Sequence, residues 1–173
     1  MSMKERILFL MPLPPPLHGA SSVSESIMNS ERINASFHCR YANIATSRDC
    51  REIGVFRPWS IMQKLMRFLT ALIVVFRQLV IFHPHKCYMA ITCHGVGFLK
   101  DAPFALLARA FGCKLILHHH NKGMQSCSHH RLYRILLSAV YRNATVILLS
   151  PRLYDDVSDI VDKKSIRICP NGI

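Results

Sequence analysis

The chain has 173 residues and a mass of 19.8 kDa, enough for one domain with one contiguous core. Half of the residues are apolar and 18% are charged, which excludes a disordered chain, and the absence of a fixed-period repeat excludes solenoids and propellers. Lysine and arginine number 22 against 10 acidic residues, giving a formal charge of +12 and a pI near 9.8. Such a charge favours an anionic partner: a nucleotide, a nucleic acid or an acidic membrane surface.

The cysteines and the apolar runs indicate the compartment. The seven cysteines are scattered, odd in number and without a C-x-x-C pair, which is typical of reduced thiols in a cytosolic protein. We expect no secretory leader, because the apolar run after Arg6 stops at Pro12. We also expect no transmembrane helix, because the longest charge-free apolar stretch, Phe68–Phe76, is far shorter than the roughly 20 residues that a span needs.

The first half of the chain predicts two strands that alternate with two helices. These are a strand at Ile7–Met11, a helix from Ser21 to about Asn29, a strand at Phe37–Ile44 and a helix over about Trp59–Phe82. The first strand is a continuous apolar run, typical of burial on both faces. The loop after it is stiffened by prolines and contains Gly19, which permits a tight turn. Strand, glycine turn and helix N-terminus together form a potential anion cradle.

The long helix combines an apolar face with basic residues. Lys64, Arg67 and Arg77 lie in it, and it contains no acidic residue. Packing of the apolar face against a sheet explains the pattern, and that face comprises Ile61, Leu65, Leu69, Leu72, Ile73, Phe76 and Val80. Contact of the basic side with anionic lipid headgroups is the alternative explanation.

The second half repeats the strand-then-helix pattern after a break at His83-Pro84. It predicts four strands, at Cys87–Thr92, Lys114–His118, Thr145–Leu149 and Ile166–Cys169. Three helices alternate with them: one capped by Asp101 with Pro103 in its first turn, one at about His129–Tyr141 and one from Ser150-Pro151 to about Val161. The second of these helices is expected to bury Leu132, Ile135, Leu136 and Ala139. About five such repeats with short turns predict an α/β protein whose Rossmann-like parallel sheet carries helices on both faces.

The expected site lies in the loops that follow the strands, because ligands of parallel sheets bind beyond the carboxyl ends of the strands. Those loops are His18–Ser22, His94–Gly97, His118–Gly123 and the turn at Ser150, and the unusual polar residues gather in them.

Most motifs that define a chemistry are absent from these loops. No G-x-G-x-x-G, P-loop or G-x-S-x-G motif occurs, which argues against dinucleotide binding, P-loop nucleotide binding and an α/β-hydrolase. Cysteines and histidines between positions 113 and 130 suggest zinc, but of the three histidines that end the strand only His118 and His120 share a face, so we expect no metal. The basic residues are spread over many elements without interleaved aromatic residues, which disfavours nucleic-acid binding.

Three stretches resemble the N-terminal domain of retaining glycosyltransferases of family 4, which have the two-domain GT-B fold. They are the opening strand with Pro14–Ser21, the segments Gly97–Phe104 and Leu115–Gly123, and the segments Val146–Ser150 and Arg167–Ile173. The second is similar to bacterial surface-polysaccharide members, and the third ends in a segment like the interdomain PNGI of the family. The resemblance implies that residues 1–169 form the acceptor-side, N-terminal half of a GT-B fold and that residues 170–173 begin an interdomain linker.

The resemblance also implies roles for single residues. Gly19 and Ala20, with His18 and Ser21 beside them, match the loop that approaches the donor phosphate and the acceptor. His120 matches a histidine near the reacting sugar, and an imidazole there suits hydrogen bonding to a hydroxyl or proton transfer. The further substrate-binding candidates are His94, Gly95, Asn121, Lys122, Gly123, Ser150, Asn171 and Gly172. A buried strand-end role for His120 and plain cap or turn roles for the last three residues are the alternatives.

The implied function is transfer of a hexose, with retained anomeric configuration, from a nucleoside diphosphate sugar to a polysaccharide or lipid-linked acceptor. No resident cofactor is expected. In the family a second domain binds the donor through a basic pair and an E-x7-E element, whereas the last glutamate here is Glu52. We therefore expect a truncated gene product, a fragment, or a subunit whose donor domain comes from another chain, and in each case a chain that is inactive alone.

Location and partners follow from the same resemblance and from the charge. We expect a peripheral protein at the inner face of the cell membrane, with Lys64, Arg67 and Arg77 touching an anionic surface. The alternative is a non-enzymatic basic α/β module that binds anionic membrane or nucleic acid.

Overall fold

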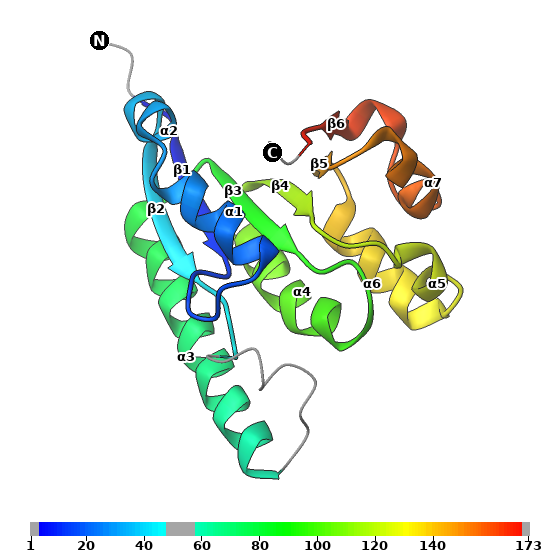
Figure 1. Cartoon of the computed structure of the whole chain (residues 1–173), viewed down its shortest axis with the longest axis horizontal. Coiled ribbons are helices and arrows are strands. Elements are labelled where there is room, and N and C mark those ends of the chain that lie inside the picture. Colours follow the sequence, from blue (N-terminus) through cyan, green and yellow to red (C-terminus); the bar gives the residue numbers. More distant parts are fainter. Residues whose placement is uncertain (1–3, 48–57, 171–173) are drawn as a thin grey trace. The chain divides into compact units, whose positions relative to one another are not determined.

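A computed structural model describes residues 4–47 and 58–170 (Figure 1). The chain divides into two compact units, Met1–His85 and Lys86–Ile173. In both units strands pair in parallel and alternate with helices, so the predicted α/β, Rossmann-like class is confirmed.

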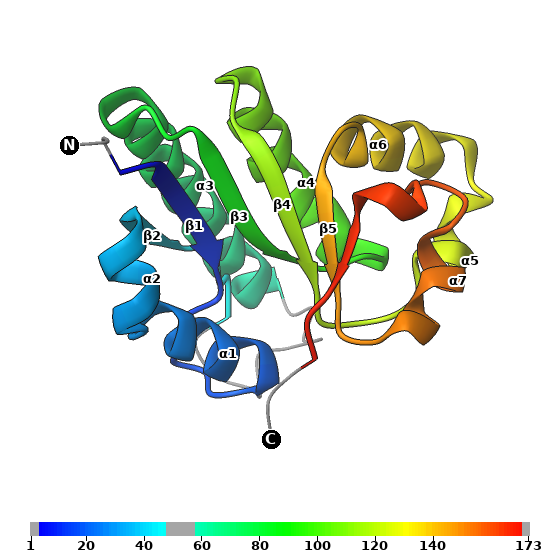
Figure 2. The same cartoon turned by 90° about the horizontal axis from the view of Figure 1, so that it is seen from above.

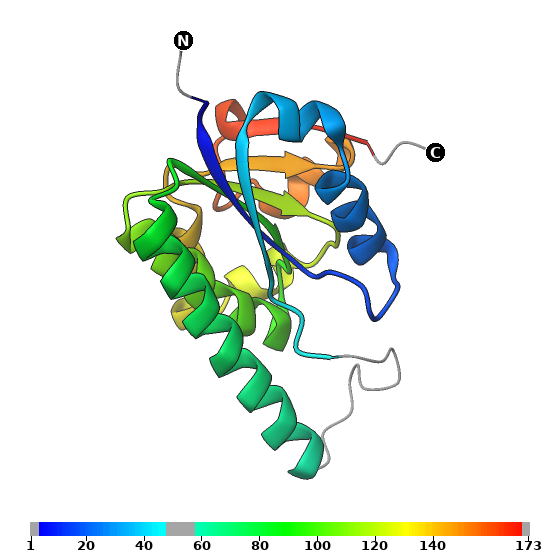
Figure 3. The same ribbon diagram turned by 90° about the vertical axis from the view of Figure 1, so that its left-hand side faces the viewer.

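The first unit is built around two parallel strands. Its elements are β1 (Arg6–Met11), α1 (Gly19–Met28), α2 (Glu31–Ser36), β2 (His38–Asn43) and α3 (Pro58–Phe82). In the register of the strands Ile7 lies opposite Cys39 and Met11 opposite Asn43. Helices α1 and α2 lie on one side of the strands and α3 on the other (Figure 3). The predicted opening strand is confirmed, since residues 7–11 are all buried.

Helix α2 was not expected from the sequence. Ser30 caps it by accepting a hydrogen bond from the Ile33 amide at 3.4 Å. None of its six residues is buried. The helix therefore needs no repeating apolar positions, and the sequence shows none there.

Helix α3 buries a different face from the one predicted. Ala71, Val75, Leu79 and Phe82 form the buried stripe, and the helix packs on β1 and β2. Six of the seven residues predicted to pack on a sheet are instead 40–61% exposed, and these are Ile61, Leu65, Leu69, Ile73, Phe76 and Val80. Because both faces are apolar, periodicity alone does not select between them, and the stripe with small Ala71 and Val75 allows the closer approach to the strands.

Helix α3 also corrects the expectation about membrane spans. By length and composition alone it could cross a membrane, with a mean hydropathy of 2.0 over 18 residues, of which 22% are buried. The sequence-based expectation failed because it counted only residues without any charge, and that count stops at Arg67 and Arg77. A mean hydropathy over 18 residues stays high even when isolated arginines are included.

The second unit contains four parallel strands in the order β3-β4-β5-β6. Its elements are β3 (Lys86–Ile91), α4 (Gly95–Ala110), β4 (Lys114–His119), α5 (Met124–Ser128), α6 (Arg131–Tyr141), β5 (Thr145–Leu148), a 3-10 turn (Pro151–Leu153), α7 (Tyr154–Val157), a second 3-10 turn (Lys163–Ser165) and β6 (Ile166–Ile168). Helices α4 and α6 pack together and lie on the same side of β3, β4 and β5 (Figure 2).

Three predictions for this unit are wrong in detail. Helix α4 begins at Gly95, so Asp101 and Pro103 lie inside it instead of at its start. Helix α6 buries Leu137, Val140 and Tyr141. Leu132 and Ile135, which were expected in the core, are 82% and 58% exposed. After Ser150 the chain forms a 3-10 turn and one turn of α-helix, shorter than the predicted helix to Val161.

Candidate functional site

Three consecutive histidines lie at the end of β4, His118 and His119 as its last residues and His120 just after it, and they divide between the two faces of the sheet. His118 and His120 lie on one face with their ring centroids 4.3 Å apart, as strand alternation predicts. His119 points to the other face, where its Nε2 lies 2.8 Å from the Tyr141 hydroxyl of α6. His118 and His119 are buried, and His120 is half-buried. Of the three, His120 is thus the least buried residue, although its Nε2 atom is itself buried.

His118 supports His120 from within the fold. Its Nδ1 lies 2.5 Å from the hydroxyl of Tyr88 on the neighbouring strand β3. Burial, and then the charge of His120, lower the pKa of His118 to about 4, while burial raises the pKa of Tyr88 well above its ordinary value. Both groups are therefore neutral at neutral pH.

His119 belongs to the core of the unit. Burial lowers its pKa to about 4, and the charge of Asp156 opposes that effect only in part. Tyr141 is buried, and its burial raises the pKa of the phenol well above the ordinary value. A neutral imidazole and a neutral phenol can share one hydrogen bond without a buried charge, so this pair is structural.

The loop after β4 is joined to the loop after β3 through Cys93 and Asn121. The Cys93 amide donates to Asn121 Oδ1 at 3.2 Å, and Cys93 Sγ lies 3.1 Å from the same oxygen and 3.3 Å from the Asn121 carbonyl. Burial, followed by the charge of Asp156, raises the pKa of the Cys93 thiol to about 12, so the sulfur acts as a donor and not as a nucleophile. Asn121, predicted to bind substrate, has its side-chain oxygen engaged in the fold.

Asp156 of α7 holds the continuation of the same loop. Its carboxylate accepts hydrogen bonds from the amides of Gly123 at 2.8 Å, Met124 at 3.1 Å and Gln125 at 3.4 Å. The residue is only 4% exposed. Sequence reasoning missed it, because Asp155 and Asp156 are adjacent and nothing in their spacing tells which one is buried.

The predicted residues His94, Gly95 and Gly123 meet in this unit. Gly123 has φ +132°, and a Cβ there would lie 2.9 Å from Cγ and Nδ1 of His94. Gly95 has φ +59°, and its carbonyl accepts a 2.6 Å hydrogen bond from the Tyr133 hydroxyl. Gly123 thus permits a close approach to His94 that a side chain at position 123 would block, whereas Gly95 supplies the left-handed backbone at the start of α4.

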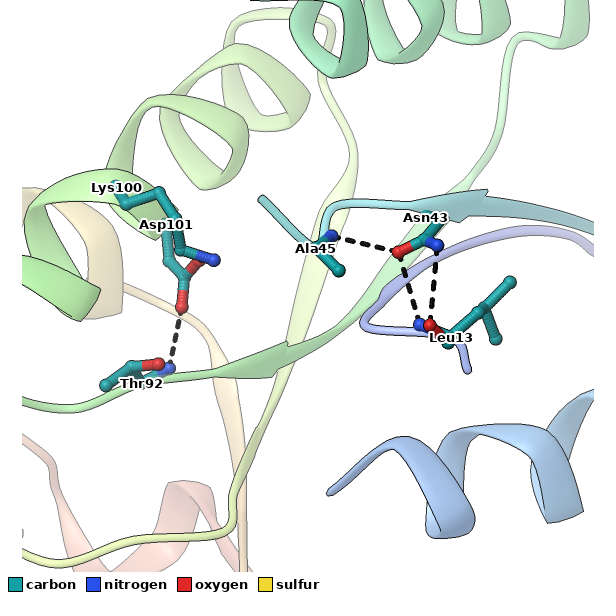
Figure 4. A network of polar contacts seen from close by, with 6 residues as sticks. All are labelled: Leu13, Asn43, Ala45, Thr92, Lys100 and Asp101. Carbon is teal, nitrogen blue, oxygen red and sulfur yellow. Dashed lines mark hydrogen bonds and ion pairs between the residues drawn. The ribbon is translucent and has the colours of Figure 1, made fainter. Parts of the chain in front are cut away.

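Asp101 fixes the end of β3 from inside α4 (Figure 4). Its Oδ2 accepts a hydrogen bond from the Thr92 amide at 2.9 Å, and its Oδ1 pairs with Lys100 Nζ at 2.7 Å. Asp101 is 1% exposed, so this side chain serves the strand terminus rather than a helix cap.

In the first unit Asn43, at the end of β2, likewise binds main-chain groups next to a strand end (Figure 4). Its Oδ1 accepts from the amides of Leu13 at 3.2 Å and Ala45 at 2.9 Å, and its Nδ2 donates to the Leu13 carbonyl at 3.5 Å. These bonds tie the proline-rich loop after β1 to the adjacent strand.

The predicted residues His18 and Ser21 form a capping box at the start of α1. His18 Nδ1 accepts from the Ser21 amide at 3.3 Å, and Ser21 Oγ accepts from the His18 amide at 2.8 Å. Ser21 is fully buried, whereas Gly19 is exposed and Ala20 half-buried. Among the described residues, nothing beyond its chain neighbours and its own helix turn lies within 4 Å of a Cβ built on Gly19, so space remains beside the first turn of this helix.

The remaining predicted residues have separate placements. Ser150 Oγ accepts from the Arg152 amide at 3.3 Å, which confirms its capping role, and Lys122 is exposed. Arg67 donates to the Thr46 carbonyl at 3.0 Å, Lys64 is half-buried and Arg77 is exposed. Asn171 and Gly172 lie outside the described residues.

Within residues 4–47 and 58–170, no group of three or more histidine, cysteine or acidic side chains is arranged to hold a metal ion. His118 and His120 are neighbours, but no third ligand joins them in that part of the chain. What the arrangement offers chemically is a half-buried imidazole at a strand terminus, next to a neutral histidine and beside a loop whose amides donate to the Asp156 carboxylate.

Fold and site together define an α/β, Rossmann-like protein with a histidine-bearing loop at the carboxyl end of a parallel strand. No protein-family model matches the sequence, and comparison with curated proteins gives no match. Among solved structures, the chain is similar to a crystal structure of MurG from Acinetobacter baumannii, with 11% sequence identity and a TM-score of 0.43. The match covers 98% of this chain and 46% of the MurG chain, so this chain spans about half the length of that protein.

Proposed function

We propose that this chain is the acceptor-side domain of a retaining glycosyltransferase that acts at the cytoplasmic face of a cell membrane. The observation that carries the proposal is the position of His120: half-buried at the carboxyl end of β4, where ligands of parallel sheets bind. The resemblance of the surrounding segments to family 4 enzymes of the surface-polysaccharide type gives the class of reaction.

In the proposed reaction a hexose passes from a nucleoside diphosphate donor to a hydroxyl of a polysaccharide or lipid-linked acceptor. His120 would orient or deprotonate a sugar hydroxyl, and the neutral His118 ring 4.3 Å away would restrict its position. Asn121, Lys122 and Gly123 follow in the loop that Asp156 and Cys93 hold, so the acceptor would meet a preorganised segment. Gly19 and Ala20 would face the donor phosphate, and a second domain, in this or another chain, would bind the nucleotide.

The test uses the membranes of cells that produce the chain. Membrane fractions are incubated with a panel of radiolabelled nucleoside diphosphate sugars, and lipid and polysaccharide products are counted for the wild type, a strain lacking the chain, and His120→Ala. We expect a product that disappears with the chain and falls roughly 100-fold in His120→Ala, the usual scale for a positioned acid–base group.

The matched control is His130→Ala, because His130 is exposed and makes no side-chain capping bond at the start of α6. It should retain full activity. A product that persists in the strain lacking the chain would contradict the proposal. Such persistence would favour the alternative, a non-enzymatic basic module, whereas near-wild-type activity of His120→Ala would return His120 alone to a structural role.

A further inference from the structure

The outward face of α3 carries a continuous apolar stripe. Its positions follow spacings of three and four residues along the helix, and its members are Met62, Leu65, Met66, Leu69, Ile73, Phe76 and Val80. All seven side chains are 40–61% exposed. The stripe lies opposite the buried residues Ala71, Val75 and Leu79, so packing on β1 and β2 turns it away from its own sheet.

A stripe of this size needs a partner, because soluble proteins rarely expose apolar patches larger than a few hundred Å². The 25 residues of α3 span about 37 Å at 1.5 Å per residue. The seven large apolar side chains occupy about 27 Å of that length, from Met62 to Val80, and form a long and narrow surface without a polar member.

The polar residues of α3 lie beside the stripe and not within it. Gln63, Thr70 and Arg77 form one margin and are exposed, with Trp59, 74% exposed, at the N-terminal end of the same margin. No acidic residue occurs in the helix, and the whole chain carries a formal charge of +12. An apolar stripe with an arginine and a tryptophan at its margin suits a lipid headgroup region, where both residue types sit at the boundary between water and acyl chains.

We propose that α3 lies in the plane of a phospholipid bilayer and inserts this stripe among the acyl chains, as a monotopic membrane anchor. It does not span the bilayer, because its opposite face stays packed on β1 and β2. Arg67 donates to the Thr46 carbonyl and Lys64 is half-buried, so apolar insertion, rather than attraction by these two charges, supplies the larger part of the binding. The inference deepens the membrane location in the proposed function but does not require sugar transfer.

The distinguishing property is resistance to salt. Cosedimentation of the full chain is measured with vesicles of phosphatidylcholine and with vesicles that also contain phosphatidylglycerol, at low salt and at about 1 M salt, where the screening length is about 3 Å. We expect binding to both vesicle types, stronger to the anionic ones, and retained at high salt. Trp59, the single tryptophan, should shift its emission to shorter wavelength and be quenched by brominated lipid.

Two variants with the same change in charge separate the stripe from its margin. Leu69→Glu/Ile73→Glu places two carboxylates on the stripe, and Gln63→Glu/Thr70→Glu places two on the margin. We expect the stripe variant to lower the partition coefficient about tenfold or more, and the margin variant to change it about twofold at high salt. All four positions are exposed, and unchanged circular dichroism confirms that both variants fold.

Three results would overturn the proposal: binding that high salt abolishes, equal losses in the two variants, or a tryptophan emission that vesicles do not change. A fourth would replace it. If light scattering shows a dimer without lipid that only the stripe variant dissociates, the stripe pairs with a second copy of the chain. None of these results bears on the activity of His120→Ala, so the two proposals fail separately.

Discussion

Removal of the Asp156 carboxylate should destabilise the loop that carries the candidate site. In Asp156→Ala the amides of Gly123, Met124 and Gln125 lose their acceptor. A hydrogen bond to a charged group contributes about 1.5–3 kcal/mol, and a buried amide left unpaired costs a similar amount. The bond from Gln125 is long at 3.4 Å and that residue is exposed, so the two shorter bonds dominate. We expect a loss of about 3–4 kcal/mol in the free energy of unfolding.

Two further substitutions calibrate the effect. Asp156→Asn keeps one oxygen acceptor but loses the charge, so it should cost about half as much. Asp155→Ala removes an exposed neighbour on the same helix turn, and its effect should stay within about 0.5 kcal/mol.

The assay combines urea denaturation followed by circular dichroism with amide hydrogen exchange of residues 123–125. In the wild type these amides should be protected, and in Asp156→Ala they should exchange at rates near those of an open loop. The reasoning would be refuted if the free energy of unfolding of Asp156→Ala lay within about 1 kcal/mol of the wild-type value and the amides of residues 123–125 stayed protected.

The other predictions concern protonation and backbone space. His118 and His119 have pKa values of about 4 in the folded state against an ordinary 6.5, so between these values the unfolded chain binds more protons than the folded one. The free energy of unfolding should therefore fall as the pH drops from about 6.5 toward 4, by at most about 1.4 kcal/mol per pH unit for each histidine, and urea titrations that give a constant value over this range would contradict the shifts. Gly123→Ala should cost about 1–3 kcal/mol by thermal denaturation, because φ there is +132° and the new Cβ would lie 2.9 Å from the His94 ring. Gly19→Ala should leave the melting temperature unchanged or slightly higher, since within the described part of the chain its Cβ position is open to 4 Å; a marked drop would show that this space is filled.

The sequence by itself determines the class of fold and most of its elements. Continuous apolar runs such as Ile7–Met11 predict buried parallel strands, because a strand covered on both faces has no need of polar alternation. Ser150-Pro151 marks a helical start through local chemistry that needs no tertiary partner, and the structure confirms the cap. The alternation of β4 likewise places His118 and His120 together, since successive side chains of a strand point to opposite faces.

The tertiary structure decides which of several apolar faces is buried and which polar groups are engaged in the fold. Helices α3 and α6 carry apolar residues on more than one face, and only contact with the strands and neighbouring helices selects Val75 over Ile73 and Leu137 over Leu132. The bonds of Asp156 to the loop after β4 join residues more than 30 positions apart, and no local spacing encodes such a contact. Sequence periodicity shows which residues share a face of a helix. Which of those faces is buried depends on the strands and helices that the rest of the chain packs against it.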